Sequence, residues 1–441
     1  MFTNKQLKQM IIPLFLEQFL VMLVGIADTF VVSYAGEAAV SGVSLVNQFN
    51  TIFIYLFTAL ASGGAVVISQ YIGHNDQDET VKSSSQLLMF STLFSIVIAV
   101  FVLIYNENIL RLMFGKVDSD VMKACITYLR ISAYSYPALA IYNAGAALYR
   151  SMGKTKTTMY ISLISNVINV IGNIIGVFVL KAGVAGVAYP SLLSRLFSAV
   201  VITVLCFNEK QSVYYKKDDI FQWDSSMLKK ILNIAIPNGV EQGIFQLVKV
   251  ALSSVVALFG TYQIAANGVA QSIWSLAALV NVTMGPIFIT VIGQCMGANQ
   301  IDEADQYFKK LIHLTVVYST IWNLLILFVT PLILHFYALS YETKKLVFIL
   351  VFIHNLFNTV ALPLSSPLSS GLRAAGDVKF TMIISIASTI LGRFVFSIIF
   401  GVYMNLGVIG IALAMCLDWI IRAIIFYLRY RSSKWREFKV I

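Results

Sequence analysis

Ile-Pro-Leu-Phe-Leu-Glu-Gln at residues 12–18 returns 224 positions later as Ile-Pro-Asn-Gly-Val-Glu-Gln at residues 236–242. The same offset pairs Gly36 with Gly260, Gln70 with Gln294, Gly73 with Gly297 and Asn75 with Asn299. The offset then falls by one residue to 223, so that Arg150 matches Arg373, and it returns to 224 where Gly183 matches Gly407. The chain is therefore two copies of one unit. Two mostly apolar copies of one unit are typical of membrane carriers, whose lobes rock around a substrate path.

Composition supports a membrane protein. The 441 residues are 58% hydrophobic and 12% charged, with a mean hydropathy of +0.81, whereas soluble domains are about one quarter charged. The net charge of +10 is spread over many short loops, which is typical of cytoplasmic loops and unlike a nucleic-acid-binding surface. The four cysteines show no CxxC spacing, so we interpret them as packing residues. We expect no nucleic-acid partner and no soluble enzyme.

Twelve segments are long and apolar enough to cross a bilayer, which takes roughly 20 residues. The predicted spans are residues 11–35, 43–71, 84–105, 127–149, 157–180 and 184–207, then 230–259, 264–295, 309–336, 346–371, 378–403 and 407–428. Six spans per copy give both copies the same orientation, so their pseudo-two-fold axis follows the membrane normal. We predict an all-α integral membrane protein with a lobe at 1–207, a linker at 208–229 and a lobe at 230–441.

The distribution of lysine and arginine predicts the orientation, because cytoplasmic loops are enriched in both. One set of loops holds most of them, including Lys5, Lys8, Lys154, Lys156, Lys216, Lys217, Lys309 and Lys379. The other set holds only Arg111, Lys116, Lys123, Lys181, Lys344 and Lys345. We therefore expect both termini in the cytoplasm and contacts with membrane lipids.

Several motifs resemble one transporter family. Asp28-Thr29-Phe30 is similar to the first-span signature of the multidrug and toxic compound extrusion (MATE) family. The loops after spans four and ten and the openings of spans six and twelve also resemble that family, at residues 148–153, 372–377, 183–188 and 407–412. The resemblance implies a V-shaped, two-lobe bacterial inner-membrane transporter, a monomer that exports lipophilic or cationic organic compounds in exchange for H⁺ or Na⁺ by alternating access.

The energy source predicted from the residues is also an ion gradient. Gly153-Lys154-Thr155 imitates the end of a phosphate-binding loop, but Leu148 occupies the place of its first glycine. The sequence therefore predicts transported H⁺ or Na⁺ and no bound cofactor. It also lacks the HExxH and GxSxG motifs of hydrolytic enzymes.

Asp28 is the main candidate for ion coupling. Inserting an ionisable group at membrane depth costs about 2.5–3.5 kcal/mol on insertion scales, so such a group is expected to have a functional or structural role. The repeat counterpart of Asp28 is Leu252, so the fold does not require an acid at this position. A carboxylate at that depth can carry H⁺ or provide a Na⁺ ligand. The alternative is a structural carboxylate that is hydrogen-bonded to neighbouring helices.

Polar residues of the fifth span are its candidate partners. Asn166, Asn169 and Asn173 share one helical face. The resemblance implies that Asn169, Asn173 and a span-six hydroxyl at Ser191 complete the first-lobe cation site with Asp28. No metal other than Na⁺ is expected there. The alternative is a ladder of asparagines that holds helices together.

A second-lobe polar site is a further candidate, formed by Glu241, Lys249, His354 and Arg393. Glu241 and its repeat mate Glu17 each follow a proline by four residues, which favours a structural role. Arg393 has another interpretation, as part of a buried ion-pair cluster. If these bases instead line a basic central cavity, the alternative function is a flippase of lipids or lipid-linked oligosaccharides.

Overall fold

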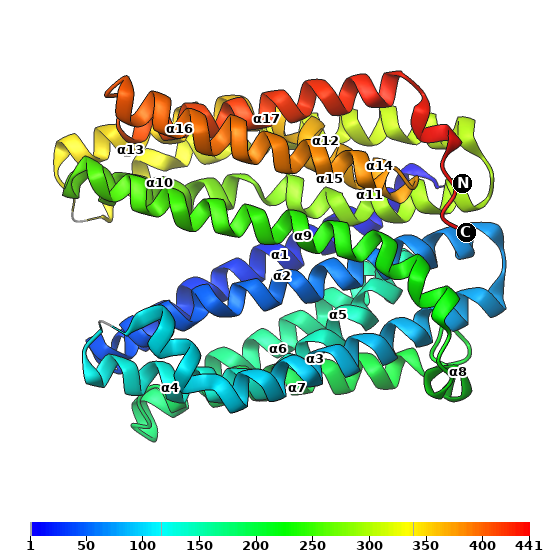
Figure 1. Ribbon diagram of the computed structural model, residues 1–441, viewed down its shortest axis with the longest axis horizontal. Coiled ribbons are helices and arrows are strands. Elements are labelled where there is room, and N and C mark those ends of the chain that lie inside the picture. The colour runs from blue at the N-terminus through cyan, green and yellow to red at the C-terminus, as the bar shows by residue number, and fades with distance from the viewer. Residues whose placement is uncertain (1, 116, 338) are drawn as a thin grey trace. The chain divides into compact units, whose positions relative to one another are not determined.

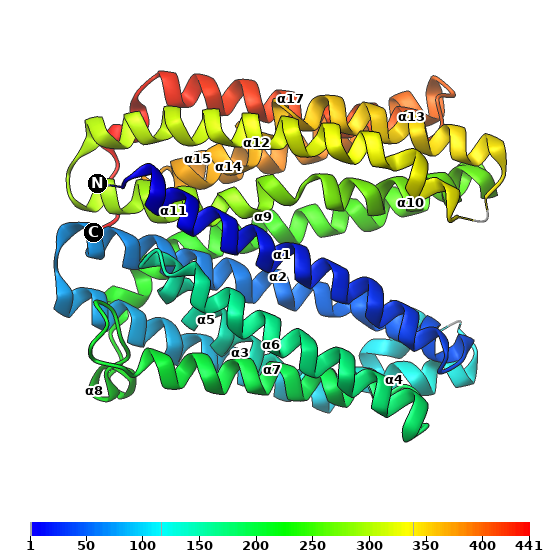
Figure 2. The same cartoon turned by 180° about the vertical axis from the view of Figure 1, so that it is seen from behind.

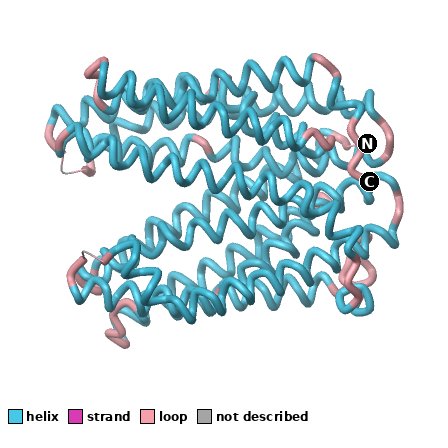
Figure 3. Tube along the Cα trace, in the orientation of Figure 1, coloured by secondary structure: helices cyan, strands magenta, loops and turns pink. Residues whose placement is uncertain are grey.

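The computed structural model describes residues 2–115, 117–337 and 339–441, and every regular element among them is helical (Figure 3). The chain forms two compact units, Thr3–Gly239 and Val240–Ile441, the second together with Phe2. By this packing the division falls inside a long helix, and the linker predicted at residues 208–229 leads into the start of that helix. The reason is close packing: a Cβ built on Gly63 would lie 2.8 Å from that of Ala235, which ties the start of this helix to the first unit.

The unit Thr3–Gly239 is a bundle of long helices, coloured blue to green in Figures 1 and 2. Its elements are α1 Asn4–Ser33, α2 Glu37–His74, α3 Gln77–Phe114, α4 Ser119–Tyr134, α5 Tyr136–Ser151, α6 Thr155–Ile174, a π-helix Ile175–Val179, α7 Ala185–Cys206, α8 Lys217–Phe221 and the first part of α9 Ser225–Val256. Val46, Val102 and Tyr136 are buried in its core, where α2, α3 and α5 meet. The functional residues discussed below lie on α1, α6 and α7.

The second unit repeats this arrangement. It holds the rest of α9, then a 3₁₀ turn Ala257–Phe259, α10 Thr261–Ala277, α11 Leu279–Gly297, α12 Ile301–His335, α13 Tyr341–Asn358, α14 Ala361–Ala374, α15 Val378–Ala387, a π-helix Ser388–Val395, α16 Phe396–Ile398, a π-helix Ile399–Tyr403, α17 Val408–Arg431 and a 3₁₀ turn Lys434–Glu437. Its packing cores lie around Ala270 and Val347 and around Trp419.

Nine of the predicted spans each fall on one helical stretch of the structure, and the other three, at 127–149, 264–295 and 346–371, each fall on two successive helices. Within the described residues, ten helices are long and apolar enough to cross a membrane. An eleventh span is counted when α13 and α14, bent by 48° at their break, are taken together. The predicted span at 127–149 is divided into α4 and α5, because the helix stops at Ser135 and restarts with Pro137 in its first turn, where proline is tolerated.

The sequence repeat is also a repeat of backbone conformation. Left-handed or otherwise positive φ values recur at equivalent turns, where glycine and asparagine are the residues that tolerate them. The equivalent pairs are Gly36 at 105° with Gly260 at 88°, Asn75 at 60° with Asn299 at 57°, Lys181 at 50° with Asn405 at 56°, and Gly183 at 57° with Gly407 at 58°. The two units therefore share one fold.

Candidate ion-coupling site

Asp28 lies on α1 and is hydrogen-bonded to α6. Asn173 donates through Nδ2 to Oδ1 of Asp28 at 2.7 Å. Asp28 is partly buried, whereas Asn173 is completely buried. Among the described residues, none forms an ion pair with Asp28. The carboxylate is therefore held by a neutral amide, and its charge is not cancelled by a permanent partner.

The hydrogen-bonded chain continues to α7. Asn173 Nδ2 also donates to Asn169 Oδ1 at 2.8 Å, and Asn169 Nδ2 donates to Ser191 Oγ at 3.1 Å. Ser191 in turn donates to the carbonyl oxygen of Val187 at 3.1 Å. The structure thus brings Asp28, Asn169, Asn173 and Ser191 into one chain across three helices. Their role in ion coupling stays a prediction.

Small residues bring α6 and α7 close enough for these contacts. A Cβ built on Gly172 would lie 2.6 Å from Cβ of Pro190. A Cβ on Gly176, in the π-helix that continues α6, would lie 2.1 Å from the carbonyl oxygen of Gly186. Close approach at small residues is how helices pack in a membrane. Larger side chains at either glycine would separate Asn169 from Ser191.

The site offers one buried oxygen atom without a hydrogen-bond donor, next to oxygens that accept from amides. Asn173 Oδ1 is buried and has no hydrogen-bond partner in the described structure. Its neighbours in the hydrogen-bonded chain are Asn169 Oδ1, Ser191 Oγ and the carboxylate of Asp28. Within the described residues, no cluster of three or more His, Cys, Asp or Glu could hold a metal ion. One carboxylate with neutral oxygens suits a hard monovalent cation or a proton rather than a transition metal.

Arg195 is a part of this region that sequence reasoning misses. It lies one turn after Ser191 on α7 and donates from Nη1 to Ser135 Oγ at 2.7 Å. It attracts Asp28 electrostatically without contacting it in an ion pair. Its position four residues after Ser191 is the signal that could have identified it, because residues four apart share a helical face.

Glu241 belongs to a structural ion pair. Arg373 donates to both of its carboxylate oxygens, at 2.9 and 2.6 Å, and also contacts Thr381 Oγ1 at 3.2 Å. In the other unit, Glu17 accepts from Arg150 at 2.8 Å and from Thr158 at 2.8 Å, and these are the repeat positions. The recurrence of the pair favours the structural interpretation of both glutamates.

The other second-lobe candidates lie in different surroundings. Arg393 and Arg422 both pair with the fully buried Asp418, at 3.0 and 2.7 Å, as the ion-pair interpretation predicts. His354 is 1% exposed, and its ring lies 6.3 Å from that of Trp419. Lys249 is exposed on α9. In the part of the chain that the structure describes, neither Glu241 nor Lys249 pairs with Asp418, so the four predicted residues do not form one site there.

Comparison with known proteins places the chain in a family. The family model described as MatE matches residues 13–175 and 237–399. The chain is 25% identical to the "Uncharacterized transporter YisQ" of Bacillus subtilis over 433 residues, 96% of this chain and 93% of the relative. It is 24% identical to the "Probable multidrug resistance protein NorM" of Thermotoga maritima over 99% of this chain and 94% of that protein.

Solved structures show the same fold. One, described as the outward-facing conformation of a multidrug resistance MATE family transporter, matches with a TM-score of 0.89 and 21% identity, over 97% of this chain and 95% of that one. A crystal structure of MATE in the straight conformation matches with a TM-score of 0.89 and 20% identity over the same shares. The chain therefore belongs to the MatE family and is a multi-pass membrane transporter, not an enzyme.

Proposed function

We propose that this transporter exports lipophilic or cationic organic compounds in exchange for H⁺ or Na⁺. The observation that carries the proposal is the hydrogen-bonded chain from Asp28 through Asn173 and Asn169 to Ser191. The substrate class is supported by relatives named as probable multidrug resistance proteins. We further propose a monomer in the bacterial plasma membrane with both termini in the cytoplasm.

In the proposed cycle, the cation competes with an amide for Asp28. Without the ion, the Asn173 amide donates to the carboxylate. A proton on Asp28 turns one of its oxygens into a donor, and Na⁺ needs oxygen ligands. In either case Asn173 is better placed with its own oxygen toward Asp28. Rotation of that amide breaks the bond to Asn169 Oδ1, so ion binding alters the packing of α1, α6 and α7. The ion thereby favours one conformation over another.

Only the first repeat supplies these ligands. The repeat positions of Asp28 and Asn169 are Leu252 and Gly392, which offer no polar side chain. A Cβ built on Gly392 would lie 3.3 Å from Cα of Asp418, so the backbones of the second unit pack closely there. We therefore propose that the coupling ion binds in the Thr3–Gly239 unit.

The flippase alternative has less support. It requires uncompensated bases that bind a pyrophosphate. Arg373 is paired with Glu241, and Arg393 and Arg422 share Asp418. Lys249 is the candidate base that is exposed. The paired arginines of the second unit do not supply the free positive charge that a flippase needs, so efflux of organic compounds is the better-supported function.

The test is efflux of a fluorescent lipophilic cation from cells or inverted vesicles, with the Na⁺ and proton gradients collapsed separately. We expect one of the two collapses to abolish wild-type efflux and thereby to identify the ion. Asp28→Asn should abolish gradient-driven efflux while the protein still inserts at wild-type levels. Undiminished efflux by Asp28→Asn would contradict the assignment of Asp28.

A further inference from the structure

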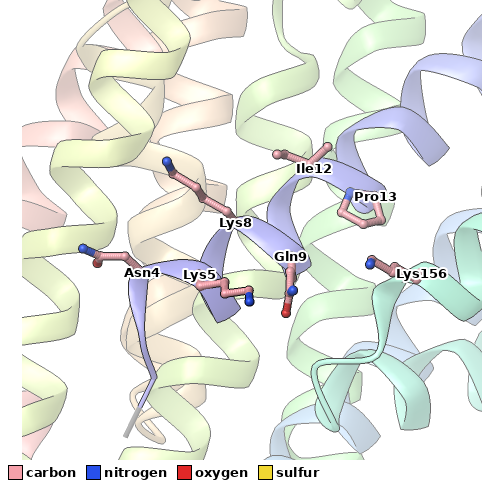
Figure 4. Close-up of a pocket in the computed structure, with 7 residues that line it drawn as sticks. All are labelled: Asn4, Lys5, Lys8, Gln9, Ile12, Pro13 and Lys156. Carbon is pink, nitrogen blue, oxygen red and sulfur yellow. The ribbon is translucent and has the colours of Figure 1, made fainter.

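A basic cavity lies on the surface of the Thr3–Gly239 unit, away from Asp28 in the sequence. It has a volume of about 500 Å³ and is lined by Lys5, Lys8, Ile12 and Pro13 of α1 and by Lys156 of α6. Figure 4 shows these side chains around the first turns of the two helices. All three lysines are exposed. The proposed ion coupling gives this cavity no role.

The walls of the cavity are fixed to each other. Thr155, at the start of α6, donates from Oγ1 to the carbonyl oxygen of Met10 at 2.9 Å and lies 3.3 Å from that of Gln9. The start of α1 is fixed by a capping box, in which Thr3 and Gln6 exchange hydrogen bonds at 2.8 and 3.2 Å. A ligand would therefore meet lysines on a preformed backbone.

The positive charge of this cavity is uncompensated. Among the described residues, none pairs an acid with Lys5, Lys8 or Lys156 within 4.0 Å. A smaller cavity on α12 and α17 provides the contrast, because its Lys309 is paired with Asp305 at 2.7 Å. Three lysines without an acidic partner line this cavity, so an anion bound there is stabilised by their positive charge.

An apolar surface continues from the basic end. Ile12 is 56% exposed at the cavity, and the exposed Leu16 follows it on α1. Tyr160 and Ile164 are exposed on α6, one and two turns after Lys156. Both helices are long and apolar enough to cross a membrane. A ligand with an anionic end and an apolar remainder therefore fits both parts of this surface.

We infer that this cavity binds the headgroup of an anionic phospholipid, with the lysines that line it (Figure 4) attracting the headgroup charge and the acyl chains along α1 and α6. Basic pockets between membrane helices on the cytoplasmic side bind such headgroups. The proposed orientation of the chain places the site in the cytoplasmic leaflet. The inference does not depend on ion coupling, because lipid binding and transport are measured separately.

The test is native mass spectrometry of the purified full-length protein, titrated with phosphatidylglycerol and, separately, with phosphatidylcholine. The variant is Lys5→Gln/Lys8→Gln/Lys156→Gln. Its matched control is Lys210→Gln/Lys216→Gln/Lys217→Gln, which removes the same charge from exposed lysines of the 208–229 segment. At about 1 kcal/mol per lysine near a membrane surface, we expect the cavity variant to bind phosphatidylglycerol roughly a hundredfold more weakly than wild type.

The control triple should keep most of the affinity, and the cavity variant should lose much less affinity for phosphatidylcholine, whose choline balances the phosphate charge, than for phosphatidylglycerol. Equal phosphatidylglycerol binding by the two triple variants would overturn the inference. Displacement of phosphatidylglycerol by millimolar inorganic phosphate would also overturn it, since the site would then be one for free phosphate. If the triple variant does not fold, the single variant Lys156→Gln, compared with Lys217→Gln, makes the same comparison with a roughly fivefold effect.

Discussion

Arg373 binds Glu241 through two hydrogen bonds, at 2.9 and 2.6 Å, in a position where both side chains are 11% exposed. Glu17 and Arg150 repeat the pair in the other unit, at 2.8 Å. Each glutamate follows a helix-interior proline by one turn, at Pro13 and Pro237. Because proline removes a backbone hydrogen bond, the ion pair fixes the helix where its own bonding is interrupted.

Glu241→Gln should destabilise the protein, because it leaves the Arg373 guanidinium buried without its counter-charge. Removing one partner of a buried pair costs about 3–5 kcal/mol. The measurement is the unfolding midpoint of the detergent-purified protein. Lys123→Gln is the control, since its ion pair with Asp120 is 77% exposed and should contribute little. Equal midpoints for the two variants would mean that the Glu241 pair has no structural role.

Asn173→Ala should weaken ion-coupled efflux at least tenfold, because Asn173 is the residue that donates to both Asp28 and Asn169. Asn166→Ala is the matched control. Asn166 lies on the same face of α6, but its Nδ2 has no hydrogen-bond partner in the described structure. We expect near-normal efflux from it. Equal losses in both variants would indicate a general packing defect of α6 rather than a specific role in coupling.

Arg195→Gln should raise the apparent affinity for the coupling cation several-fold, since it removes a positive charge that attracts Asp28 and repels an incoming ion. The measurement is efflux rate against the concentration of the coupling ion. Arg195→Lys retains the charge and should leave the half-saturating concentration close to that of wild type. An unchanged value in Arg195→Gln would show that the arginine serves only to bind Ser135.

Some of this site could be predicted from the sequence, and the reason is helix geometry. Asn169 and Asn173 are one turn apart, so their common face follows from the helical period. The spans follow from apolar length in the same way. The ion-pair cluster of Asp418 is predictable too, because Arg422 lies one turn away on the same helix. The partner of Glu241 could not be predicted, because Arg373 is far away in sequence. Their proximity depends on how helices pack, and hydropathy does not specify that.

The start of α9 should respond to pH through Asp224. This side chain accepts from the backbone N–H of Met227 at 2.9 Å and pairs with Lys82 at 2.5 Å. The hydrogen bond from Lys82, and then those from the backbone, lower the pKa of Asp224 below its ordinary 3.8. A lowered pKa means that the stabilisation is fully present above pH 3.8 and is lost as the pH falls through the lower, folded-state value.

Asp224→Ala should therefore lower the unfolding midpoint at pH 7, by an amount that corresponds to a helix cap of about 1 kcal/mol. The difference from wild type should shrink as the pH falls below about 4. Asp218→Ala is the control, because the exposed Asp218 of α8 makes no ion pair among the described residues and should show no such difference. A wild-type advantage over Asp224→Ala that is unchanged between pH 7 and pH 3 would contradict the role of the ionised carboxylate.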